Sequence, residues 1–146
     1  MRILLLQGAN MEWLGIRQPE LYGTTTAKEL DAIMEGEAQR LGVELEIAYT
    51  NLEGVAIDRI YRAVREGVDG LLMNPAGFLY SGYALRACIR GVRIPYVEVH
   101  MTNIERRQMH SVLAVEADGL VVGLGIDSYR LGLEALVRVI ARMRQD

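Results

Sequence analysis

Polar side chains that could transfer protons follow the ends of three short apolar runs. They are Asn10, Arg17 and Tyr22 after the first run, Asn74 and Tyr80 after another, and His100, Thr102 and Arg107 after a third. The set holds no serine or cysteine nucleophile beside a base, and no acidic cluster for a metal ion. Its phenol, imidazole, guanidinium, amide and hydroxyl groups suit proton transfer on an anionic organic substrate.

The first three of these residues lie in a long connection over residues 7–23. It follows a predicted buried strand at residues 2–6 and precedes a predicted helix over residues 24–42, with a capping box that begins at Thr26. Connections of this kind usually have about two to six residues, and longer ones are often functional. Because α/β proteins bind ligands beyond the carboxyl ends of their strands, we expect this loop to form the lid and one wall of an active site.

Apolar periodicity predicts the elements that must position these residues. The predicted strands are residues 2–6, 43–49, 70–73, 94–99 and 119–122, and the helices are residues 24–42, 51–66, 81–89 and 127–142. Residues 102–109 are compatible with either a short helix or an ordered loop. The alternation predicts an α/β fold, a flavodoxin-like three-layer sandwich whose five-stranded parallel sheet has the order 2-1-3-4-5. In such a sheet the polar residues would meet at one rim.

Composition bounds the class of protein. A chain of 146 residues, 51% hydrophobic and 24% charged, is expected to form one domain over residues 1–146. The net charge of −3 and a pI near 5.5 argue against a nucleic-acid partner. No run is long enough to span a membrane, and residues 1–6 do not resemble a signal peptide. The single cysteine, Cys88, suits the cytoplasm, and two histidines with one cysteine make no zinc pattern.

Residues 8–23 follow the pattern G-x-N-x-x-x-L-G-x-R-x-P-x-x-Y-G, which resembles the first motif of the type II 3-dehydroquinate dehydratase family. Further matching segments are residues 51–54 with 57–58, 74–75, 84–86, 98–103 and 122–125. The resemblance covers nearly the whole chain, and the family's flavodoxin-like fold agrees with the predicted one. It implies the shikimate-pathway step from 3-dehydroquinate to 3-dehydroshikimate, in which a cyclic β-hydroxyketone carboxylate loses water through an enolate, without metal or organic cofactor.

The resemblance implies a role for each residue of the proton-transfer chemistry. Tyr22 would be the base that removes the proton α to the ketone. A free tyrosine, with a pKa of ~10, is a poor base at neutral pH, but the cationic neighbours Arg17 and Arg107 would favour the phenolate. Asn10 would hold the water that stabilises the enolate oxygen. His100 would protonate the departing hydroxyl.

Other residues would orient these groups or bind substrate. Glu98 would orient His100, and Asn74 would contact the substrate near the departing hydroxyl. Thr102, in place of the family's usual serine, and the backbone of Met101 would bind the carboxylate. Tyr80 occupies a substrate-facing position.

The chain departs from the family at the positions that grip the far hydroxyls of the ring. Tyr80 replaces a substrate-binding histidine, and Ala87 replaces an aspartate that reaches a neighbouring subunit's site. The segment after Arg107 is shorter than in the family and lacks a further arginine, and residues 7–10 read Gln-Gly-Ala-Asn instead of Asn-Gly-Pro-Asn. A divergent paralogue therefore stays open as an alternative. It would be a lyase or isomerase for a different, less hydroxylated keto acid, or a catalytically weak binding or assembly subunit.

The family also forms trimers that gather into dodecamers. Apolar residues of the third predicted helix are expected to be exposed in a suitable position: Tyr83, Ala84, Cys88 and Ile89. The resemblance thus implies a homo-oligomer built from trimers, a dodecamer.

Each site residue has a structural interpretation as well. Arg17 and Tyr22 could be a surface arginine and a packed tyrosine, and Asn74 could shape a turn before Pro75. Glu98 and His100 could be buried, hydrogen-bonded strand residues. Arg107 could belong to a solvated charged turn, and Tyr80 could be a packing aromatic.

Overall fold

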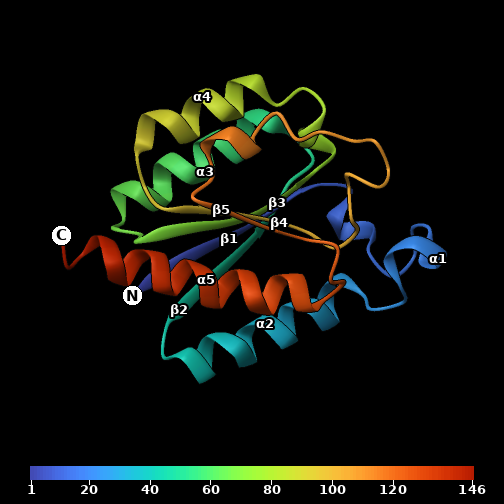
Figure 1. The fold of residues 1–146 in the computed structure, drawn as a ribbon, viewed down its shortest axis with the longest axis horizontal. Coiled ribbons are helices and arrows are strands. Elements are labelled where there is room, and N and C mark those ends of the chain that lie inside the picture. The colour runs from blue at the N-terminus through green and yellow to red at the C-terminus, as the bar shows by residue number, and fades with distance from the viewer.

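The computed structural model describes residues 1–146 and contains one parallel sheet between two layers of helices (Figure 1). The five strands lie in the order β2-β1-β3-β4-β5. Their bounds are β1 Arg2–Ala9, β2 Glu44–Tyr49, β3 Gly70–Ala76, β4 Tyr96–His100 and β5 Gly119–Val122. All neighbouring strands are parallel. This confirms the predicted flavodoxin-like fold and strand order.

Two apolar cores lie on opposite faces of the sheet. Helices α2 (Ala27–Leu41) and α5 (Asp127–Met143) cover one face, and α3 (Glu53–Arg65) and α4 (Tyr83–Val92) cover the other (Figure 1). Alternate residues of β1 supply both cores, with Ile3 and Leu5 on the first face and Leu4 and Leu6 on the second. A central strand that is apolar on both faces is typical of a covered parallel sheet.

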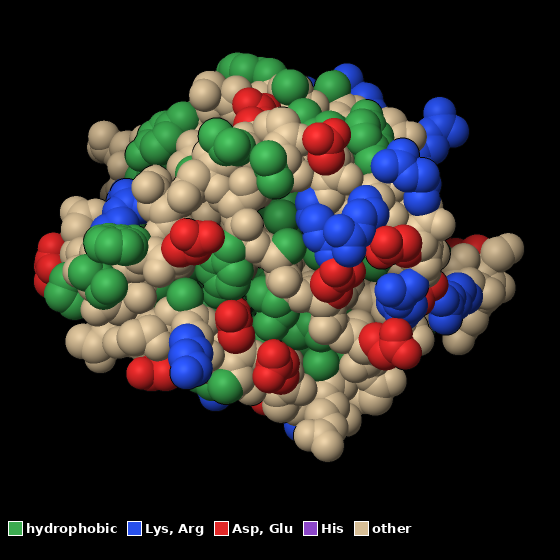
Figure 2. Space-filling model, turned by 180° about the vertical axis from the view of Figure 1, so that it is seen from behind, with side chains coloured by type: hydrophobic (Ala, Val, Ile, Leu, Met, Phe, Trp, Pro, Cys, Tyr) green, Lys and Arg blue, Asp and Glu red, His purple; other side chains and the backbone are tan.

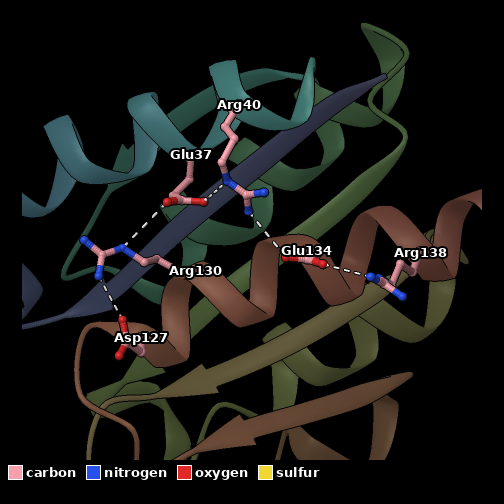
Figure 3. Close-up of polar contacts among 6 residues, drawn as sticks. All are labelled: Glu37, Arg40, Asp127, Arg130, Glu134 and Arg138. Atoms are coloured by element: carbon pink, nitrogen blue, oxygen red, sulfur yellow. Dashed lines mark hydrogen bonds and ion pairs between the residues drawn. The ribbon is translucent and has the colours of Figure 1, made fainter.

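Charged side chains connect the two helices of the first layer (Figure 3). Glu37 of α2 pairs with Arg40 and with Arg130 of α5, at 2.8 Å and 3.7 Å. Arg40 also reaches Glu134 of α5 at 3.3 Å, and the row continues to Asp127 at one end and Arg138 at the other. Exposed pairs stabilise little one by one, but this network joins the carboxyl-terminal part of α2 to α5.

The loop between β1 and α2 contains two short helical segments. Strand β1 continues to Ala9, and the loop contains a 3-10 turn (Met11–Trp13) and the short helix α1 (Pro19–Tyr22). Thr26 caps α2 as predicted, because its hydroxyl accepts the Glu29 N–H at 3.1 Å. Residues 102–109 form an ordered succession of turns, without a helix.

Close backbone contacts hold the edge of the sheet from which this loop leaves. A Cβ atom at Gly8 would lie 2.0 Å from the Pro75 carbonyl oxygen, so β1 and β3 can approach there only because Gly8 lacks a side chain. The next residues turn sharply, since Asn10 and Ala76 have positive φ angles of 77° and 47°.

One prediction about the third predicted helix is wrong. Tyr83 and Ala84 are exposed, but Cys88 and Ile89 are buried at 4% and 3% exposure. Cys88 and Ile89 follow Leu85 at helical spacing, so all three face the core beneath α4. None of the helices combines the length and the apolar composition that a membrane span requires.

Candidate active site

A cavity opens at the carboxyl edge of the sheet, where the loop after β1 meets the ends of β3 and β4. It encloses about 700 Å³, open solvent included. Nine of the residues predicted for the site line it: Asn10, Arg17, Tyr22, Asn74, Tyr80, His100, Met101, Thr102 and Arg107. The tenth, Glu98, lies behind His100. The structure therefore brings together all the predicted site residues.

The Tyr22 hydroxyl lies among cations. Arg107 Nη1 donates to the Tyr22 hydroxyl oxygen at 3.2 Å and to Thr102 Oγ1 at 2.9 Å. The guanidinium carbons of Arg17 and Arg107 lie 5.5 Å and 5.6 Å from the centre of the Tyr22 ring. Neither arginine forms an ion pair with a carboxylate. The Tyr22 hydroxyl oxygen therefore has a guanidinium donor, and two cations without a carboxylate partner lie beside its ring.

His100 is held from behind by a buried carboxylate. Glu98 Oε2 lies 2.8 Å from His100 Nε2, and the Tyr96 hydroxyl donates to Glu98 Oε1 at 2.6 Å. Burial raises the pKa of Tyr96, and the Glu98 charge raises it further, so Tyr96 stays protonated and acts as the donor. An ionised carboxylate only accepts hydrogen bonds, so the His100 proton on this side lies on Nε2. The other ring nitrogen, Nδ1, is left for exchange with a ligand.

A second buried network fixes Asn74. Its Nδ2 donates to the Tyr129 hydroxyl at 2.8 Å, and that hydroxyl donates to Gln7 Oε1 at 2.7 Å. The Asn74 Oδ1 accepts the N–H of Ala76 at 2.9 Å. The side-chain amide of Asn74 is thus oriented before any ligand binds. Gln7 Nε2 remains buried without a partner.

The remaining wall of the cavity is largely apolar. Leu14, Leu79, Ile104 and Met109 line it, and Tyr80 stands 65% exposed at the rim. Asn10 is also exposed, with its backbone N–H bonded to Asn51 Oδ1 at 2.8 Å. The lining thus combines these apolar side chains with the polar groups described above. No group of three or more His, Cys, Asp or Glu residues is placed to hold a metal ion.

The family model for class II dehydroquinases matches residues 1–137. The chain belongs to the class II dehydroquinase family. A protein named 3-dehydroquinate dehydratase from Xanthomonas euvesicatoria pv. vesicatoria is 44% identical over 147 residues, 99% of this chain and 97% of the relative. Another of that name, from Carboxydothermus hydrogenoformans, is 42% identical over 149 residues, 100% of this chain and 96% of the relative.

Solved structures of class II dehydroquinases agree with this membership. The type II dehydroquinase of Butyrivibrio crossotus has a TM-score of 0.89 at 32% identity, covering 94% of this chain and 97% of that chain. The type II dehydroquinase of Propionibacterium acnes has a TM-score of 0.86 at 31% identity, with 96% of each chain covered. Both the overall fold and the family predicted from the motifs are confirmed.

The buried residues whose hydrogen bonds orient the side chains of this dehydroquinase site were not predicted from the sequence. Tyr129 and Gln7 lie far from Asn74 in the chain, and no local pattern connects them. Tyr96 could have been found, because it precedes Glu98 and His100 at the two-residue spacing of one strand face. The apolar wall residues Ile104 and Met109 lie in a segment whose structure the periodicity left undecided.

Proposed function

We propose that this dehydroquinase chain converts 3-dehydroquinate to 3-dehydroshikimate, using the residues that meet in the cavity. The observation that carries the proposal is the contact of Arg107 with the Tyr22 hydroxyl, in the same cavity as the His100–Glu98 pair. A phenol activated as a base and an imidazole available as an acid are the two groups that an elimination needs. The names of the relatives supply the substrate.

The proposed reaction divides proton removal and proton donation between these groups. The Tyr22 phenolate takes the proton α to the ketone, and the electron pair moves onto the ketone oxygen to form the enolate. Asn10 holds a water that donates to this oxygen. The enolate then expels the β-hydroxyl, which takes a proton from His100 and leaves as water. The two proton transfers and the loss of water balance without a further reactant, and the proposed reaction uses no metal or organic cofactor.

Substrate binding is assigned to groups around this pair. Thr102 and the backbone of Met101 bind the carboxylate, and the charges of Arg17 and Arg107 favour an anion in the cavity. Asn74 contacts the substrate near the departing hydroxyl, with its amide held by Tyr129. The partner is accordingly a small carboxylate, in a cytoplasmic enzyme.

A less hydroxylated keto acid is the alternative substrate, and the apolar wall favours it. Tyr80 and Ala87 stand where the family places groups that bind ring hydroxyls, and Leu79, Ile104 and Met109 add apolar side chains to the lining. A buried hydroxyl left unpaired typically costs about 1–3 kcal/mol of binding. On this alternative the carboxylate and the β-hydroxyketone are kept, and the far side of the ring carries fewer hydroxyls.

The assembly that we propose is a homo-oligomer built from trimers, a dodecamer. Hydrophobic side chains reach the surface over the layer of α3 and α4, at the top of Figure 2. Exposed hydrophobic residues of this layer, or directly before it in the chain, are Leu52, Val55, Tyr61 and Tyr83. Because Cys88 and Ile89 are buried, this surface is smaller on α4 than the sequence suggested. Light scattering at micromolar concentration should show multiples of three chains, and a monomer alone would contradict the assembly.

Direct assay of 3-dehydroquinate tests the function. Loss of water creates a double bond conjugated with the ketone, so turnover appears as new ultraviolet absorbance. We expect turnover by the purified chain and its loss in Tyr22→Phe. A panel of carboxylated β-hydroxyketones with fewer hydroxyls should be assayed in parallel. Faster turnover of one of them would establish the alternative, and turnover of none would leave a binding or assembly subunit.

A further inference from the structure

Tyr96, Glu98 and His100 form a continuous hydrogen-bonded row on one face of β4. The row begins at the Tyr96 hydroxyl, passes through both oxygens of the Glu98 carboxylate and ends at His100 Nε2. The exposed fractions of the three residues are 0%, 0% and 4%. Only the His100 end reaches the cavity.

No other charged side chain forms a hydrogen bond with the side chains of this row. The titratable groups on the surrounding elements are engaged elsewhere: Cys88 with Tyr61, Arg86 and Arg90 with Glu116, Arg59 and Arg62 with Glu46, Glu53 with the Leu85 N–H, Asp118 with the Tyr96 N–H, and Arg107 with Tyr22 and Thr102. His110 is exposed, away from the row. The Glu98 carboxylate therefore divides its hydrogen-bonding capacity between one phenol and one imidazole.

This division bears on how readily His100 releases its proton. A carboxylate that already accepts a strong bond from Tyr96 has less negative charge to offer an imidazolium. The protonated form of His100 is then less stabilised than it would be beside Glu98 alone, so it is a stronger acid. A stronger acid is better suited to protonating a departing hydroxyl at the same pH.

We propose that Tyr96 is a positioning residue which, acting through Glu98, makes His100 a stronger acid than the Glu98–His100 pair would be alone. The use of this acidity in catalysis rests on the proposed function, in which His100 protonates the departing hydroxyl. The effect on His100 itself does not depend on the substrate.

The chain offers a direct measurement, because it has only two histidines, His100 and His110. Titration of the imidazole carbons by NMR follows both, and the exposed His110 serves as the internal reference. Tyr96→Phe removes the hydroxyl and keeps the ring. Tyr129→Phe is the matched control, since Tyr129 is equally buried and its hydroxyl bonds Asn74 and Gln7 instead.

We expect His100 in Tyr96→Phe to titrate at a higher pH than in the wild type. The rise should be roughly 0.5–1 unit, a fraction of the roughly one to three units that a full neighbouring charge produces. His110 should not move, and Tyr129→Phe should leave His100 unchanged. An unchanged His100 in Tyr96→Phe, or an equal rise in Tyr129→Phe, would overturn the proposal.

A second measurement keeps the test decisive if Tyr96→Phe does not fold. Site-specific incorporation of 3-fluorotyrosine at position 96 retains ring and hydroxyl and makes the phenol a stronger donor. His100 should then titrate at a lower pH, and no change or the opposite change would contradict the proposal.

The pH profile of kcat adds a catalytic readout. A general acid must be protonated, so a rise in the His100 pKa should move the alkaline limb of kcat in Tyr96→Phe to higher pH. The NMR titration needs no substrate, so it tests the inference even if the chain does not turn over 3-dehydroquinate. Failure of the proposed function can therefore be distinguished from failure of this inference. An NMR shift without a shift of the alkaline limb would reject His100 as the acid and leave its coupling to Tyr96 intact.

Discussion

Arginine meets different partners at the two edges of the sheet. At the amino edge, Asp69 accepts the backbone N–H of Arg2 at 2.7 Å, pairs with Arg144 and lies 4.0 Å from the terminal amine. At the carboxyl edge, Arg17 and Arg107 face a phenol ring and hydroxyl oxygens, with no carboxylate. Guanidinium charges that are neutralised serve stability, whereas charges left with neutral partners remain available to a phenolate and an anionic substrate.

The largest loss of activity is expected at the carboxyl edge, when the hydroxyl of Tyr22 is removed. In Tyr22→Phe the two cations keep their places but lose the group that they would activate. Loss of a general base typically lowers the rate by roughly 10²–10⁴-fold. Steady-state kinetics should show this fall in kcat with an unchanged thermal midpoint. A near-normal rate would place the base elsewhere, with His100 as the next candidate.

Removal of one unneutralised charge should have a smaller effect. Arg107→Leu deletes the donor that Tyr22 and Thr102 share. Hydrogen bonds to charged groups contribute about 1.5–3 kcal/mol, so kcat/KM should fall by roughly 10- to 100-fold. The matched control is Arg106→Leu, because Arg106 is the adjacent exposed arginine and lies outside the cavity. An equal fall of kcat/KM in both variants would mean that Arg106 and Arg107 act only through their positive charge and not through a specific contact with Tyr22.

The parts of the site that could be predicted are those encoded by short spacings. Arg17 and Tyr22 lie in one loop, and Glu98 and His100 alternate along one strand, so local geometry places each pair together. The strand order was predicted from the alternation of strands and helices together with the wide first loop. For residues this close in the chain, the local backbone conformation is enough to predict that their side chains lie together.

Contacts between distant segments could not be predicted in this way. Arg107 reaches Tyr22 across 85 positions, a proximity that only the family resemblance implied. Tyr129 reaches Gln7 across 122 positions, which nothing in the sequence indicated. These contacts depend on how turns pack against the loop, which periodicity does not describe. The wrong prediction at Cys88 and Ile89 could have been avoided from the sequence. These residues follow Leu85 by three and four positions, and this helical spacing places all three on the buried face.

Substitutions at Tyr80 and Ala87 should show whether these two residues limit the turnover of 3-dehydroquinate. Tyr80→His combined with Ala87→Asp restores the residue types that the family uses to bind ring hydroxyls. One restored partner is worth about 1–3 kcal/mol, so kcat/KM for 3-dehydroquinate should rise roughly 10-fold. Tyr80→His alone separates the effect of residue 80 at the rim from that of residue 87, where the family's aspartate reaches a neighbouring subunit. A wild type that matches an ordinary 3-dehydroquinate dehydratase, with no gain in the double variant, would show that the apolar wall does not limit the substrate.

The smallest effect is expected at the amino edge, where the charges are already neutralised. Burial alone would raise the pKa of Asp69, but the Arg2 N–H, the Arg144 guanidinium and the terminal amine outweigh it and hold the pKa below its ordinary value. Such a carboxylate stabilises the fold at pH above its unfolded-state pKa of ~3.9, and this stability is lost as the pH falls through the folded-state value. Asp69→Asn should therefore lower the free energy of unfolding at pH 7 by about 1 kcal/mol, the upper range for a partly exposed ion pair. Urea unfolding measured from pH 7 down to about pH 3 should show the free energy of unfolding of the wild type falling toward that of Asp69→Asn in acid.

The control is Asp58→Asn, at an exposed carboxylate of α3, which should change the free energy of unfolding little. The value of kcat should be the same in the wild type and both variants. A fall in kcat in Asp69→Asn without loss of stability would mean that the two edges are coupled, and the separation of stabilising from activating arginines would not hold.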